Sequence, residues 1–175
     1  MMKSLMIYFL LCVPCLAGKI VSFYSSTDPK NVAVLSDSAL EKEPEIDHFV
    51  HLCPGYGGYE LLHRSGDLRS WIDVRFQGKT SDLYGDVMNA GRGQFVHKAN
   101  HVVEWRGVRE GDVFTPFALI YRVNAQDPEN PDKSHTTLIV IALNKGDAKL
   151  LGTASGKNED ADAKKLADQA APKSE

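Results

Sequence analysis

The side chains best suited to chemistry lie in one short segment, residues 47–53, which reads Asp-His-Phe-Val-His-Leu-Cys. Imidazole and thiolate groups are good ligands for zinc and copper. On a strand, side chains two residues apart share a face, so His51 and Cys53 would lie together and His48 would point away. The spacing matches no standard zinc motif, and a tetrahedral site would need ligands from elsewhere in the chain. Four histidines are available for that role: His63, His97, His101 and His135. We expect no cofactor, with a metal ion held by His51 and Cys53 as the alternative.

Cys53 beside a histidine is also the pairing of a thiol nucleophile with its base. Such a cysteine needs a lowered pKa, which commonly comes from a helix N-terminus or a nearby cation. Here Cys53 would lie at the end of a strand before Pro54, with no helix expected behind it. A buried core thiol is the simpler interpretation, because free cysteine is among the most buried residue types. No motif in the sequence specifies a reaction. The glycine-rich loop 55–59, for example, lacks the ending of a P-loop.

A second pattern is aromatic and cationic. Arg69, Trp71 and Arg75 alternate along one predicted strand, on the face opposite its apolar residues. Tryptophan, tyrosine and arginine are enriched at binding hot spots. Seven residues are therefore candidate binding residues: Tyr56, Tyr59, Arg69, Trp71, Arg75, Trp105 and Arg106. The alternative is that cross-strand pairs of these residues only stabilise a sheet, with Trp71 as core if a helix covers that face.

These residues require strands to position them. Residues 68–76 alternate apolar and polar side chains, the period of a strand exposed on one face, and a turn at 65–67 predicts a hairpin over residues 59–76. Residues 83–88 and 95–97 read as further short strands, and residues 136–143 are apolar on both faces, as in a central strand. Turn signals every eight to twelve residues predict a mainly β fold, an antiparallel sandwich or barrel-like sheet. The alternative class is α+β.

The ends of the chain differ from this body. We expect residues 18–48, which contain Pro44, to form an irregular lead-in, and residues 49–152 to form the β-rich domain. We expect a short helix and a polar tail over residues 153–175. Asn158 is a suitable N-cap, and the residues after it place apolar side chains, mostly alanine, at helical spacing. We expect this helix to dock weakly on the sheet, and the alternative is a solvated helix that frays.

Residues 1–17 have the pattern of a secretion signal. Lys3 precedes an almost wholly apolar run over residues 5–16, and small residues follow, so we expect cleavage after Ala17. The run is shorter than the ~20 residues that a membrane-spanning helix needs. We therefore expect an exported chain, periplasmic or extracellular, with no transmembrane segment after cleavage.

Cysteine content and charge narrow the class further. Cys12 and Cys15 lie within the predicted signal, so Cys53 is the only thiol of the exported chain and no internal disulfide is expected. The formal net charge is −3. Nucleic-acid-binding proteins usually carry a clustered basic face, so we expect no nucleic-acid partner.

Four segments resemble the sequence blocks of an uncharacterised group of small exported bacterial proteins. They read Cys-Pro-Gly-Tyr-Gly-Gly-Tyr at 53–59, Ser-Gly-Asp-Leu-Arg at 65–69, Val-Glu-Trp-Arg-Gly at 103–107 and Pro-Phe-Ala-Leu-Ile at 116–120. The resemblance spans roughly residues 50–170. It implies a periplasmic setting, and it carries over no activity and no catalytic residues.

Taken together, these patterns predict an exported β-rich binding or interaction module. Its partner would be an envelope protein or a small ligand of unknown identity. One alternative is a small metal-dependent or thiol enzyme built on His51 and Cys53, although nothing in the sequence specifies a reaction. The other alternative is a structural component of the cell envelope.

Overall fold

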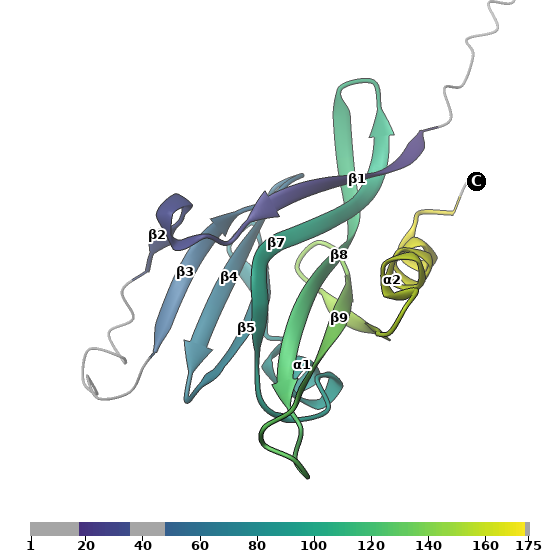
Figure 1. Ribbon diagram of the computed structural model, residues 1–175. Coiled ribbons are helices and arrows are strands. Elements are labelled where there is room, and N and C mark those ends of the chain that lie inside the picture. Colours follow the sequence, from purple (N-terminus) through teal and green to yellow (C-terminus); the bar gives the residue numbers. More distant parts are fainter. Residues whose placement is uncertain (1–17, 36–47, 174–175) are drawn as a thin grey trace, which may run out of the picture.

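The computed structural model describes residues 18–35 and 48–173, which form two antiparallel sheets of five strands each (Figure 1). Sheet A has the order β1 (Lys19–Ser26), β7 (Gln94–Glu110), β8 (Val113–Gln126), β9 (Ser134–Ala142), β10 (Lys149–Ala154). Sheet B has the order β2 (Ala33–Val34), β3 (Phe49–Pro54), β4 (Tyr59–Gly66), β5 (Arg69–Phe76), β6 (Lys79–Ser81). The helical elements are α1 (Tyr84–Ala90), α2 (Glu159–Ala167) and the 3₁₀ turns η1 (Pro29–Asn31) and η3 (Asp168–Ala170). The mainly β, antiparallel fold with a short C-terminal helix is confirmed, as a pair of sheets rather than a closed barrel.

The main core lies between the two sheets. Sheet A contributes Trp105, Leu119 and Ile139, and sheet B contributes Leu61 and Ile72, all of them fully buried. They occupy alternate positions on their strands, so one face of each strand enters the core. Burying each such side chain contributes roughly 1.5–3 kcal/mol. With no disulfide among the described residues, this burial is the main source of stability.

The outer face of sheet A is covered by α2, which lies against β8 and β9 in Figure 1. Leu138 and Val140 on β9 pack there with Ala163 and Ala167 of the helix. The alanines have short side chains, and this lets the helix approach the sheet closely. The docking predicted for this helix and the burial of β9 on both faces are thereby confirmed. Asn158 does precede the helix, but its side chain makes no capping hydrogen bond.

The hairpin predicted over residues 59–76 is confirmed as β4 and β5, in a register that places Tyr59 opposite Phe76 and Gly66 opposite Arg69. The turn at 65–67 obtains its positive φ angles from residues other than its glycine. Asp67 and Leu68 adopt positive φ angles of 49° and 62°, as a tight hairpin turn requires. Gly66 instead ends β4, where a Cβ atom would approach His48 Nδ1 to 2.4 Å.

Three other parts of the chain differ from the sequence expectations or lie outside the description. The lead-in expected to be irregular contains β1, which pairs with β7 along its whole length, and β2. Residues 83–88, expected to form a strand, belong largely to helix α1, which buries only Val87. The predicted signal, residues 1–17, lies outside the described residues.

Candidate functional site

A pocket of about 570 Å³ opens on the face of sheet B that is turned away from sheet A. The hairpin β4–β5 supplies its floor, and β6 with the segment leading into α1 supplies one wall. The lining residues are His48, Arg64, Gly66, Asp67, Arg69, Trp71, Asp73, Thr80, Asp82 and Tyr84. Two of the seven candidate binding residues, Arg69 and Trp71, therefore meet in one place. The volume falls within the range of roughly 300–1,000 Å³ that is typical of small-ligand sites.

Two aromatic rings form one side of this pocket. Trp71 and Tyr84 lie edge to face, with ring centroids 4.7 Å apart and planes inclined by 64°. Trp71 is half-buried because it also touches the main core, whereas Tyr84 is 42% exposed. Trp71 Nε1 donates to Asp73 Oδ1 at 3.1 Å, which fixes the orientation of the indole. The pocket thus offers an apolar surface of defined geometry.

Asp73 holds the floor of the pocket together. Its carboxylate is almost fully buried, accepts the backbone N–H of Leu83 at 2.9 Å, and forms an ion pair with Arg64 at 2.7 Å. Burial raises the pKa of Asp73, and the Leu83 hydrogen bond and the Arg64 charge oppose that rise. The Arg64 guanidinium is therefore committed to a carboxylate inside the protein.

The second arginine of the pocket is also paired. Arg69 forms an ion pair with the exposed carboxylate of Asp67 in the hairpin turn. Its guanidinium carbon lies 5.4 Å from the centre of the Phe95 ring, within the range of a cation–π contact. Each guanidinium in the pocket thus has a carboxylate partner from the same β4–β5 hairpin.

Three candidate binding residues lie outside the pocket, at the end of the core near β1: Trp105, Tyr59 and Tyr56. The first two are buried. Trp105 is fully buried, and its Nε1 donates to Ser25 Oγ at 2.9 Å. Tyr59 is also buried, and its hydroxyl accepts the backbone N–H of Lys145 at 2.7 Å. Both are core residues rather than parts of an open binding face.

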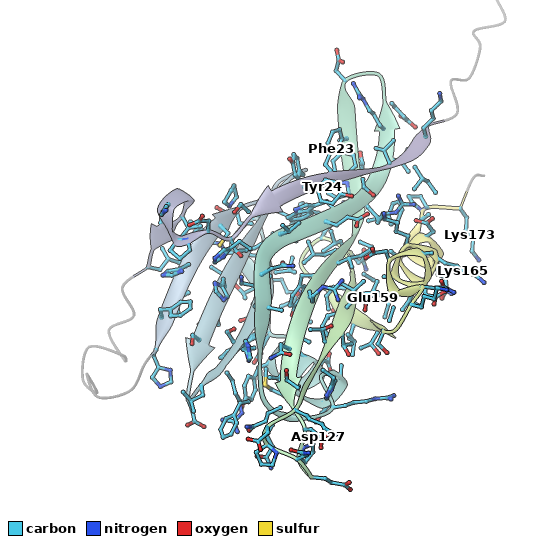
Figure 2. All side chains as sticks on the ribbon, in the orientation of Figure 1. Phe23, Tyr24, Asp127, Glu159, Lys165 and Lys173 are labelled. Atoms are coloured by element: carbon cyan, nitrogen blue, oxygen red, sulfur yellow. The ribbon has the colours of Figure 1, made fainter. Side chains whose placement is uncertain are left out.

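Tyr56 belongs to an aromatic group beside β1. Its ring stacks on Phe23 with centroids 5.6 Å apart, and its hydroxyl donates to the backbone oxygen of Tyr24 at 2.9 Å. Phe23 and Tyr24 are labelled on β1 in Figure 2. Tyr56 thus connects β1 to the end of sheet B and lines none of the pocket around Trp71.

The two remaining arginines are engaged in ion pairs. Arg75 lies on the pocket face of β5, and its Nε contacts Glu60 Oε2 at 2.8 Å across the hairpin. Arg106 lies on the other face of sheet A from Trp105 and makes a bidentate pair with Asp168 of η3, at 2.7 and 2.8 Å. Arg106 therefore fastens the C-terminal segment to the sheet.

His51 and Cys53 lie together on the inner face of β3, as the spacing predicts, and His48 lines the pocket on the opposite face. Cys53 is 1% exposed, and burial raises the pKa of its thiol. Within residues 18–35 and 48–173, no group of three His, Cys, Asp or Glu side chains is placed to hold a metal ion. The thiol is protonated at neutral pH and has the environment of a core residue.

Sequence reasoning missed a set of buried polar side chains beside this thiol. His63 stands opposite His51 across β3 and β4 and is only 6% exposed, and neither of its ring nitrogens has a partner in the described part of the chain. Burial lowers the pKa of His63 to about 3 and that of Lys98 to about 8. The sequence offers one signal for the burial of His63: it follows Tyr59 and Leu61 at alternate positions of one strand, and these share a face.

Comparison with known proteins finds no matching family model, curated protein or solved structure. Among the helices of the described residues, none has the length and apolar character needed to cross a membrane.

Proposed function

We propose that the protein is an exported ligand-binding module, and that the pocket around Trp71 and Tyr84 is its binding site. The observation that carries this proposal is an aromatic pair placed over paired charged groups in an open pocket. Sites of this composition fix a ligand by an apolar contact and a few directed polar groups. Export is supported by the signal-like residues 1–17.

The supports of the pocket favour binding over a purely structural role. Trp71 and Asp73 lie on β5, which is paired on both sides in sheet B, and Asp73 accepts a hydrogen bond from the backbone that leads into α1. A side chain held by packing and hydrogen bonds loses little freedom when a ligand arrives. No comparable support exists for a thiol enzyme, because Cys53 is buried and its pKa is raised.

The proposal is tested with the mature chain, uniformly ¹⁵N-labelled and screened by NMR against a library of small ring-bearing fragments. The chain has two tryptophans, so the indole N–H signals report separately on Trp71 in the pocket and Trp105 in the core. We expect several fragments to move the Trp71 signal saturably and to leave the Trp105 signal in place.

A matched pair of variants sharpens the test. Trp71→Ala should abolish the fragment shifts of the remaining pocket residues. Arg75→Ala should preserve them, because Arg75 lies on the same strand face but outside the pocket lining. Fragments that bind nowhere on the protein, or equally well to the Trp71→Ala variant, would contradict the proposed function.

A further inference from the structure

We infer that the ligand of this pocket is an uncharged saccharide whose ring lies against the Trp71–Tyr84 pair. This inference rests on the proposed function and adds the chemical class of the ligand. It is argued from the charge balance of the pocket, from its shape and from the groups at its rim.

The charge of the pocket is almost balanced, and its cations are already neutralised. Arg64 pairs with Asp73, and Arg69 pairs with Asp67. A phosphate or carboxylate ligand would have to compete with these carboxylates and would also face the charge of Asp82. A cationic ligand would have to compete with both guanidinium groups for Asp73 and Asp67, which leaves Asp82 as the remaining carboxylate of the lining. A neutral ligand avoids both costs, because it brings no charge that must be desolvated.

The shape of the pocket suits a ring with two different surfaces. The edge-to-face arrangement of Trp71 and Tyr84 presents one flat apolar surface and one ring edge inclined to it. A sugar ring carries C–H groups on a face and hydroxyl groups around its edge. The C–H face can pack on the aromatic pair while the hydroxyl edge turns toward the polar rim.

The rim supplies groups that hydrogen-bond to hydroxyls in both directions. Carboxylates accept, guanidinium groups donate, and the hydroxyl of Thr80 does both. The carboxylate of Asp82 is held in place because its Oδ1 accepts the backbone N–H of Tyr84 at 3.0 Å. Hydrogen bonds to charged groups are the stronger ones, so Asp82 is the side chain on which we expect binding to depend most after the aromatic pair.

The experiment titrates the mature protein with neutral trisaccharides of gluco, galacto, manno and N-acetylhexosamine type, and follows the Trp71 indole signal. An aryl monophosphate and a tripeptide serve as charged ligands that contain no sugar ring. We expect at least one trisaccharide to give saturable shifts, with an affinity that does not change between low and high salt. Screening acts on charged ligands and spares neutral ones.

Variants identify the contact. Tyr84→Ala, at an exposed ring, should weaken sugar binding about tenfold without loss of folding, and Asp82→Asn should weaken it several-fold. Arg75→Ala should leave it unchanged. If fragments shift Trp71 but no trisaccharide does, or if only the phosphate ligand binds and salt weakens it, the saccharide inference is overturned and the binding site stands. If neither fragments nor sugars shift Trp71, both proposals fail.

Discussion

The ammonium nitrogen of the buried Lys98 lies 3.5 Å from Nδ1 of the exposed His101, and it donates to the backbone oxygen of Asn100. Lys98 is 9% exposed. Burial lowers its pKa to about 8 from the ordinary value of 10.5. The positive charge is therefore held at neutral pH against a desolvation cost.

Lys98→Met should be at least as stable as the natural protein at pH 7, because an apolar side chain of similar length removes a buried charge. Between pH 8 and 10.5 the unfolded state of the natural protein binds more protons than the folded state. Its stability should therefore rise over this window, by on the order of 2 kcal/mol, relative to the variant. Urea unfolding at pH 7.5 and pH 10 measures the difference. Lys149→Met, at an exposed lysine, should show no such relative change.

His63 should make the stability of the protein depend on pH in the acidic range. Its folded-state pKa of about 3 lies below the ordinary 6.5, so the unfolded state takes up the proton first as pH falls. Stability should fall below pH 6.5, and His63→Leu should remove on the order of 2 kcal/mol of the loss by pH 4.5. The variant should also gain about 1 kcal/mol at pH 7, since it removes two unpartnered polar atoms. His97→Gln, at an exposed histidine, is the control and should be as acid-sensitive as the natural protein. If His63→Leu is equally acid-sensitive, this account is wrong.

Cys53 should be unreactive in the folded protein. We expect no labelling by a thiol reagent until urea unfolds the chain, because the side chain is buried and its pKa is raised. Cys53→Ser should lower the free energy of unfolding by about 1–3 kcal/mol, since it buries a hydroxyl. Cys53→Ala separates this effect from lost volume.

The same purified protein allows the metal alternative to be tested by elemental analysis. We expect a chelator to leave the melting temperature unchanged. One equivalent of zinc or copper that disappears in His51→Ala or Cys53→Ala would restore the metal site predicted at those residues.

The bidentate pair between Arg106 and Asp168 should hold the C-terminal helix against sheet A. Arg106→Met should cost about 1 kcal/mol, a value reduced because Asp168 is partly exposed. Amide hydrogen exchange in α2 should accelerate more than exchange in β9. Arg109→Met, at the exposed pair with Asp112, should leave both rates unchanged.

Alternation of apolar and polar residues predicted those strands that turn one face into the main core and the other face away from it. Alternation alone revealed the hairpin of β4 and β5, because Ile72 and Val74 lie fully in the core while Trp71 and Asp73 line the pocket on the other face. The same rule failed to show that Trp105 faces the core. On its strand, β7, Trp105 and Arg106 lie on opposite faces of the sheet. Which of them is open to solvent depends on what packs on each face, and the sequence of β7 does not show this.

The pocket itself could be predicted only in part. Trp71 and Arg69 share a strand, so their spacing in sequence indicates their common face. Tyr84 arrives from the start of α1, and Asp82 from the segment before it. Side chains contributed by separate elements meet only through tertiary packing, which no local pattern in residues 79–90 records.

The pairing of β1 with β7 sets an order for folding. Lys19 lies opposite Arg109, so the strand nearest the start of the described chain has its partner far along the sequence. Contacts this distant slow folding, because a long loop must close before they stabilise anything. During synthesis β1 emerges before β7, so it has no partner strand until β7 has been made. Until then its apolar Ile20 and Phe23 are open to contacts with other chains, and exposed apolar side chains of this kind promote aggregation during folding.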